Sequence, residues 1–255
     1  MTKLSALVIT YNEVIHIDDL ITNLSFADEI IVVDSYSSDG TYEKLKSYNK
    51  VKLYQREFKN FSDQKNYALS LTSHDWVLFI DADERLSTLL ISEIKKVIND
   101  SSSKIVAYYC KFQYYFENTP IKYSGFQTAK SYRLFRASKC KYNTAKEVHE
   151  NLIIQGDNGL LKGKIKHYSF RDYAHYKEKM RLYAHIKAKQ LYNNGKRKTF
   201  FNSKIKPIYR FINHYIMRLG ILDGKVGFYI SKLNAYEVKE RYNELDRLYK
   251  VLVSK

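Results

Sequence analysis

The stretch Trp76–Ser87, WVLFIDADERLS, constrains the fold of this chain more than any other part of it. Its first five residues, Trp76–Ile80, are apolar and have no helical period, which predicts a buried strand of a parallel sheet. Three carboxylates follow within four positions, at Asp81, Asp83 and Glu84. Because open α/β sheets bind ligands at the carboxyl ends of their strands, we expect a functional site at this point.

The spacing of these acids favours a metal site. Side chains of an extended segment repeat with a period of two, so Asp81 and Asp83 are expected to point the same way. Two carboxylates on one side suit Mg²⁺ or Mn²⁺, with phosphate oxygens completing the coordination shell. The alternatives are that the acids are solvated in a loop, or that Asp83 caps the next helix. A D-x-D pattern alone is weak evidence, but its place directly after an apolar strand favours the metal.

Strand-like and helix-like segments alternate along the first hundred residues. Apolar runs predict strands at 4–10, 29–33 and 52–54. Helical periodicity and capping residues predict helices at 15–24, 41–49, 61–70 and 93–100, the second capped by Asp39 or Thr41 and the third by Ser62 or Asp63. This alternation predicts a parallel, doubly wound α/β sheet. The glycine patterns of dinucleotide folds and P-loops are absent from the sequence, so neither is indicated.

The pattern changes after residue 100. Aromatic, β-rich segments at 105–116, 130–135, 151–154 and 164–169 predict a second group of strands, antiparallel or mixed. From residue 172 onward the chain is helix-like, with segments at 180–192, 207–219 and 228–248. Glycines interrupt the last two helices at Gly220, Gly224 and Gly227.

The charge is unevenly distributed. Residues 162–255 hold 23 Lys and Arg against 7 Asp and Glu, so this part carries the whole net charge of +16. Residues 1–161 hold 20 of each sign and are neutral. This asymmetry predicts an anionic surface as partner of the C-terminal part. The sequence has no apolar run of membrane-spanning length and no signal-peptide pattern, and its two cysteines fit a reducing cytosol.

Seven segments in order resemble a known family: ALVITYNE, IIVVDSYSSDGT, FSDQKNYAL, WVLFIDADE, YRLFR, VHE and KHYS. Together they resemble the inverting family-two glycosyltransferases of the GT-A fold, and among these the bacterial lipopolysaccharide-core β-glucosyltransferase-like proteins. The resemblance implies a Rossmann-like nucleotide-sugar-binding sheet with a C-terminal helical extension. We therefore expect a GT-A catalytic domain at 1–170, with a donor half at 1–100 and an acceptor half at 101–170, and a basic helical extension at 171–255.

The resemblance also implies roles for single residues in donor binding. The alternatives from the residues alone are core packing for Tyr11, a turn for Asp34 and an ordinary partly buried histidine for His167. The roles implied are a nucleoside pocket at Thr10, Tyr11 and Glu13, a base or ribose contact at Asp34, a base contact at Lys65, a ribose or water-mediated contact at Asp81, and metal ligation by Asp83 and His167.

Inversion requires a base that takes the proton of the acceptor hydroxyl. Glu150 matches the family's late acidic residue and is the expected base, with Glu147 as competitor and His149 as a further base or phosphate contact. Arg133 and Arg136 are expected to contact either phosphate or a structural ion-pair partner.

The expected function is transfer of a hexose from a nucleotide sugar, UDP-sugar favoured, to a cell-envelope glycan or lipid-linked saccharide. The expected location is the cytoplasm, attached peripherally to the anionic inner face of the membrane through 171–255. Lys196–Lys198 and Pro207–Leu219 are the expected contact, with the apolar stripe of the helix packed on the catalytic domain. The alternatives are a nucleotidyltransferase acting on sugar phosphates and a nucleic-acid-binding protein. A nucleic-acid partner is not expected, because the basic charge avoids the α/β half.

Overall fold

The computed structural model describes residues 2–143 and 152–253, and it divides the chain into two compact units. Unit 1 comprises Met1–Phe112 and Ala129–His167, and unit 2 comprises Gln113–Thr128 and Tyr168–Lys255. The chain therefore passes from one unit to the other three times. The second crossing from unit 1 to unit 2 lies close to the domain boundary expected at 170, while 113–128 joins the helical unit.

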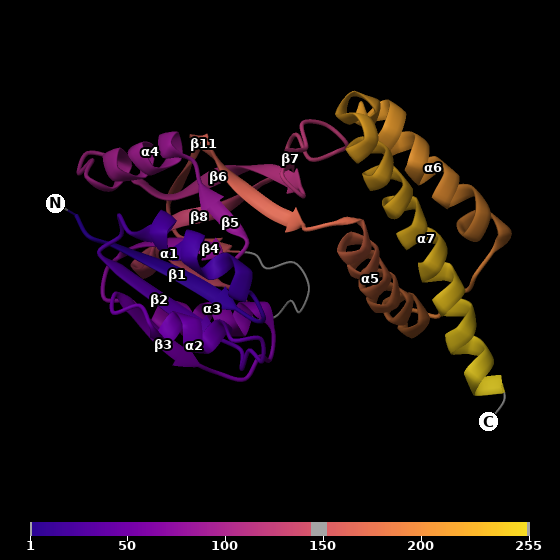
Figure 1. The fold of residues 1–255 in the computed structure, drawn as a ribbon, viewed down its shortest axis with the longest axis horizontal. Helices are drawn as coiled ribbons and strands as arrows, with labels where there is room; N and C mark the ends of the chain where they lie inside the picture. The colour runs from indigo at the N-terminus through magenta and orange to yellow at the C-terminus, as the bar shows by residue number, and fades with distance from the viewer. Residues whose placement is uncertain (1, 144–151, 254–255) are drawn as a thin grey trace. The chain divides into compact units, whose positions relative to one another are not determined.

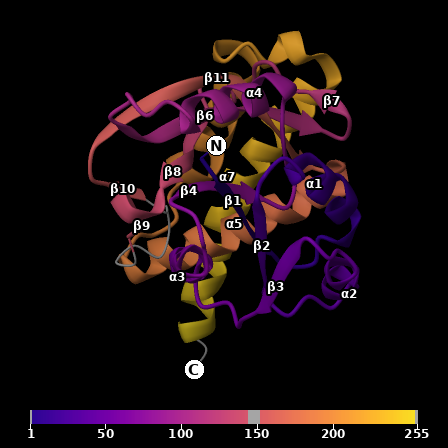
Figure 2. The same ribbon diagram turned by 90° about the vertical axis from the view of Figure 1, so that its left-hand side faces the viewer.

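Four parallel strands form the first part of the sheet of unit 1. They are β1 (Leu4–Thr10), β2 (Glu29–Asp34), β3 (Val51–Gln55) and β4 (Trp76–Asp81), in the spatial order β3-β2-β1-β4. Figure 2 shows this order from β3 to β4. All seven residues of β1 are buried, as expected for a central strand covered on both faces.

Antiparallel strands extend the sheet beyond β4. The order continues β8-β6-β11-β5, with β8 antiparallel to β4 and β5 antiparallel to β11. A short pair, β9 with β10, forms a second sheet, and β7 pairs with β6. The bounds are β5 Glu84–Leu86, β6 Ile105–Phe116, β7 Thr119–Pro120, β8 Lys130–Arg136, β9 Cys140–Tyr142, β10 Leu152–Ile154 and β11 Asp157–Phe170.

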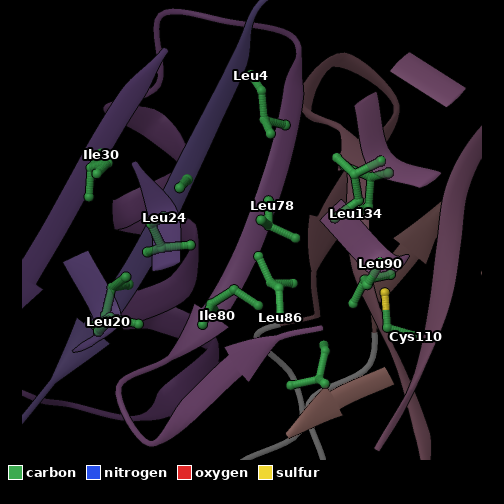
Figure 3. Close-up of a cluster of buried hydrophobic side chains, with 14 of the residues drawn as sticks. Leu4, Leu20, Leu24, Ile30, Leu78, Ile80, Leu86, Leu90, Cys110 and Leu134 are labelled. Carbon is green, nitrogen blue, oxygen red and sulfur yellow. The ribbon is translucent and has the colours of Figure 1, made fainter. Parts of the chain in front are cut away.

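Alternate residues of each strand enter two cores, one on each face of the sheet. Leu4, Ala6 and Val8 of β1 belong to one cluster, and Leu7 and Ile9 belong to the other. Figure 3 shows the first cluster running from Ile30 across Leu78 to Leu134 and Cys110. The helices of unit 1 are α1 (Ile17–Leu24), α2 (Thr41–Lys46), α3 (Phe61–Ser70) and α4 (Thr88–Ile98).

Unit 2 is built mainly from helices. Two of them, α5 (Tyr173–Asn193) and α6 (Lys206–Ile212), pack against the long α7 (Gly224–Val253), as Figure 1 shows. Two π-helical turns, η3 (Phe201–Ile205) and η4 (Asn213–Met217), flank α6 and make one continuous helical segment with it. Phe116, Phe170, Tyr176, Met180 and Ile230 belong to a shared apolar core.

One aspartate ties the loop after β7 to the start of α7. The carboxylate of Asp223 accepts hydrogen bonds from the backbone N–H groups of Lys122 and Tyr123, at 2.9 and 3.0 Å, and from the hydroxyl of Ser124 at 2.7 Å. The backbones cross closely here: a Cβ added to Gly227 would lie 1.8 Å from the carbonyl oxygen of Gly220. This close approach explains why position 227 is a glycine.

The main strands and helices predicted from the sequence are confirmed, but several details are wrong. α3 is capped by Asn60, whose side chain accepts a hydrogen bond from the N–H of Asp63, and not by Ser62 or Asp63. α4 begins at Thr88 with Ser87 as its cap, several residues before the predicted start. This cap also excludes Asp83 as the cap of that helix.

Candidate active site

Three neighbouring parallel strands end at one edge of the sheet of unit 1. The register aligns Thr10 of β1 with Asp34 of β2, and Ile9 of β1 with Asp81 of β4. The sheet therefore brings Thr10, Asp34 and Asp81 together although they are far apart in the sequence. This edge is where open α/β sheets bind their ligands.

A cavity of about 280 Å³ lies at this edge. Five of the residues expected from the sequence line it: Thr10, Tyr11, Glu13, Asp81 and Asp83. The other lining residues are Ile9, Ser35, Phe58, Phe61 and Ala82. Sequence reasoning did not select Phe58 and Phe61, whose rings meet edge to face with centroids 4.9 Å apart.

Thr10 and Tyr11, at the carboxyl end of β1, offer polar groups to a ligand. Tyr11 is 59% exposed, so it is not a core residue. The hydroxyl of Thr10 is buried and has no hydrogen-bond partner among the residues that the structure describes. A buried hydroxyl without a partner is costly, which favours a ligand at this point of the cavity.

Asp34 is the last residue of β2 and is fully buried under the loop that follows this strand. Its carboxylate accepts hydrogen bonds from the N–H and hydroxyl of Ser37 and from the side chain of Gln55. These are the contacts of a turn-forming residue, the alternative that the sequence left open. The base or ribose contact of Asp34 stays a prediction.

The acidic motif, Asp81–Glu84, is a turn and not the extended segment that the sequence predicted. Strand β4 ends at Asp81. The turn consists of Ala82 and Asp83, and Glu84 begins the separate strand β5. β5 pairs with β11, and this register places His167 directly opposite Glu84. The reversal of direction is therefore fixed by pairing with a strand about 80 residues later.

This pairing brings the two expected metal ligands together. Nε2 of His167 lies 3.1 Å from Oδ2 of Asp83, and Nδ1 lies 3.7 Å from Oε1 of Glu84. No group of three or more His, Cys, Asp or Glu with metal-site geometry occurs among residues 2–143 and 152–253. Asp83 and His167 are an oxygen and a nitrogen donor on one side of the motif, which fits a divalent ion completed by phosphate oxygens.

Arg133 is the counter-charge of the motif. Its buried guanidinium donates to Oδ2 of Asp81 at 2.6 Å and to Oε1 of Glu84 at 2.5 Å. Arg133 thus has the structural ion pair that the sequence left open as an alternative to phosphate binding. Arg136 likewise pairs with Asp75 at 3.0 Å.

Burial and charge act on the carboxyl pKa values in opposite directions. Burial would raise the pKa of Asp81, but the charges of Arg133 and Lys65 outweigh it and hold this pKa well below its usual range. At Glu84, which is fully buried, burial dominates over Arg133 and raises the pKa to about 7. Burial would lower the pKa of His167, but the hydrogen bond and charge of Asp83 raise it. Asp81 is therefore held ionised beside the cavity.

Lys65 is a buried lysine of α3. Its Nζ lies 4.5 Å from the ring centroid of Phe79 and 5.4 Å from that of Tyr142, and its charge lowers the pKa of Asp81. The expected base contact of Lys65 stays a prediction. Glu150, Glu147 and His149 lie outside the described residues.

Comparison with known proteins gives one consistent result. The family model described as Glycosyl transferase family 2 matches residues 5–157. The chain is 27% identical to the lipopolysaccharide core biosynthesis glycosyltransferase LpsC of Rhizobium meliloti, covering 94% of this chain and 93% of that protein. It is 30% identical to an uncharacterized glycosyltransferase of Rickettsia conorii, covering 92% and 86%. Among solved structures, TarS 1-349 of S. aureus matches with a TM-score of 0.47 and 18% identity, covering 95% of this chain and 92% of that one.

Proposed function

Since the chain belongs to glycosyl transferase family 2, we propose that it transfers a hexose from a UDP-sugar to a cell-envelope glycan or lipid-linked saccharide, with inversion at the anomeric carbon. The observation that carries this proposal is the cavity at the carboxyl ends of β1 and β4. It combines acids, an exposed tyrosine and an unpartnered buried hydroxyl, which suit a nucleoside diphosphate sugar. We favour an acceptor from the lipopolysaccharide core, because the relative LpsC is named as a lipopolysaccharide core biosynthesis glycosyltransferase.

In this proposal the lining of the cavity positions the donor. Thr10, Tyr11 and Glu13 contact the nucleoside, with Asp34 and Lys65 toward the base. Asp81 contacts the ribose directly or through water. Asp81 is fixed by Arg133, so it presents an ionised acceptor without having to move.

Asp83 and His167 would hold a divalent ion next to the diphosphate of the donor. When bound, Mg²⁺ or Mn²⁺ neutralises the negative charge that grows on the departing nucleoside diphosphate. An imidazole ligand favours Mn²⁺ over Mg²⁺. The contact between His167 and Asp83 keeps both candidate metal ligands on the side of the turn that faces β11.

The acceptor hydroxyl must lose its proton as it attacks the anomeric carbon from the face opposite the leaving group. We propose that the carboxylate of Glu150 takes this proton, with Glu147 as the competing base. Such assistance contributes roughly 10²–10⁴-fold to the rate.

Peripheral attachment to the inner face of the cytoplasmic membrane completes the proposal. The excess of 23 basic over 7 acidic residues in 162–255 suits an anionic leaflet, where each nearby Lys or Arg contributes about 1 kcal/mol. No helix in the described part of the chain is both long enough and apolar enough to cross a bilayer.

A donor screen tests the proposed reaction. The protein is incubated with Mn²⁺ or Mg²⁺ and a panel of UDP- and GDP-sugars, and slow hydrolysis to free nucleoside diphosphate is followed. We expect release from one UDP-sugar that requires the metal and is absent from the Asp83→Asn variant. Equal release by the variant, or no release from any donor, would refute the proposed donor site.

A further inference from the structure

The helical segment Phe201–Met217 of unit 2 has two faces of unusual composition. The face packed toward the rest of unit 2 carries Ser203, Pro207 and His214, all buried. His214 lies with Nδ1 2.8 Å from the carbonyl oxygen of Ser124, and this contact fixes that face inward. The buried positions are thus mostly small or polar.

The opposite face carries the large apolar side chains. Phe201, Ile205, Ile208, Ile212 and Ile216 follow one another at spacings of four, three, four and four, which places them on one stripe. They are 60%, 41%, 59%, 44% and 52% exposed, respectively. We name these five residues the outer stripe. A water-facing helix ordinarily buries its isoleucines and phenylalanines, so this arrangement is the reverse of the usual one.

The charge around the outer stripe identifies the partner. From Asn193 to Leu222 the chain has seven Lys and Arg and no Asp or Glu. Lys196, Lys204 and Lys206 are exposed. A large apolar stripe without acids and flanked by lysines matches a helix lying in the interface of an anionic bilayer, where basic groups meet phosphates and apolar groups reach the acyl chains.

We propose that the outer stripe inserts into the acyl boundary of an anionic membrane surface and anchors unit 2 there. This inference rests on the peripheral attachment proposed above and adds the chemical nature of the contact. Lysines alone would give attachment that high salt reverses, whereas insertion of the stripe gives a component that high salt leaves in place. Packing of the stripe on the catalytic domain, which the sequence led us to expect, is the alternative to this proposal.

A tryptophan placed in the stripe tests insertion directly. The chain has a single tryptophan, Trp76, which is buried in unit 1 and 2% exposed. The variant Ile212→Trp is mixed with phosphatidylglycerol vesicles whose acyl chains carry bromine. We expect its emission to move to shorter wavelength and to be quenched, while Trp76 in the unaltered protein is not. Leu160→Trp, at an exposed position of β11, is the matched control and is expected to stay unquenched.

Two paired variants separate apolar from electrostatic binding in flotation assays. Ile208→Ser with Ile212→Ser is expected to weaken binding to the vesicles at least about tenfold at both low and high salt. The reason is that two apolar side chains no longer move from water into the acyl region. Lys196→Gln with Lys204→Gln is expected to weaken binding mainly at low salt. Both variants are expected to retain wild-type donor hydrolysis, which shows that they fold.

The outcomes distinguish this inference from the attachment on which it rests. Flotation with anionic vesicles without quenching of Ile212→Trp would refute insertion and leave the electrostatic attachment intact. No flotation at low salt would refute both. A dimer that the Ile208→Ser, Ile212→Ser variant abolishes, without quenching by lipid, would assign the outer stripe to a second copy of the chain and also refute insertion.

Discussion

Replacing Glu29 by glutamine tests how a buried carboxylate at the amino end of β2 stabilises the sheet. Its side chain accepts hydrogen bonds from the hydroxyl of Ser5 at 2.6 Å, from Nζ of Lys52 at 2.5 Å, and from the N–H and hydroxyl of Ser73 at 3.0 and 2.8 Å. These contacts join β1, β2, β3 and the segment before β4. Glu29 lies at the end of the strands opposite to the cavity, so its effect on stability is separate from catalysis.

The magnitude follows from its pKa. Burial would raise this pKa, but the hydrogen bonds from Lys52, Ser5 and Ser73 outweigh burial and lower it from 4.5 to about 2. Because the folded-state pKa is depressed, the stabilisation is present above pH 4.5 and is lost as the pH falls toward 2. The carboxylate then contributes about 3 kcal/mol to the free energy of unfolding at pH 7 and roughly half of that at pH 3.

Urea unfolding of the wild type and of Glu29→Gln measures this contribution between pH 7 and pH 3. Fluorescence of Trp76 reports the unfolding of unit 1, since this residue is buried in its core. We expect the difference in unfolding free energy to shrink by about half over this range. The exposed Glu57, replaced by glutamine, is the control and should show no such trend. A difference between wild type and Glu29→Gln that is constant with pH would refute the reasoning.

Three further predictions concern catalysis and the helical unit. Asp83→Asn should abolish donor hydrolysis while the protein stays folded, as its melting curve will show, since its carboxylate serves charge at a turn; full activity would remove the metal from the proposal. Glu150→Gln should lower acceptor glycosylation by roughly 10²–10⁴-fold and leave donor binding, measured by calorimetry, unchanged. If Glu147→Gln has this effect instead, the base is Glu147. Gly227→Ala should destabilise the protein by about 3 kcal/mol, because its Cβ would meet the carbonyl of Gly220, and an unchanged melting temperature would contradict this.

Three of the four parallel strands were predictable because each is a nearly continuous apolar run. β1, β2 and β4 are buried on both faces. Such a strand is a continuous apolar run, which can be recognised in the sequence without knowing the strands that pair with it. Their order along the chain also located the edge where Thr10, Asp34 and Asp81 meet. Local pattern and tertiary structure agree in this part of the molecule.

The geometry of the acidic motif was not predictable from local pattern. Glu84 becomes part of a strand because β11 lies beside it, and this partner is far away in the sequence. The ion pair of Arg133 with Asp81 and Glu84 depends in turn on the pairing of β8 with β4. The orientation of the outer stripe is a third case, since periodicity identifies a stripe but does not say which face of the helix its neighbours cover.

The aspartate that ties the loop after β7 to α7 has a consequence for where this protein can be cut. The family match ends at residue 157, and a fragment ending near 170 would contain every residue proposed for donor binding. It would also lack Asp223, which accepts the hydrogen bonds of Lys122, Tyr123 and Ser124. Residues 113–128 would keep their place in the sequence but lose the helices with which they form a compact unit. We therefore expect the smallest fragment that folds on its own to be longer than the family match and to include the helices of unit 2.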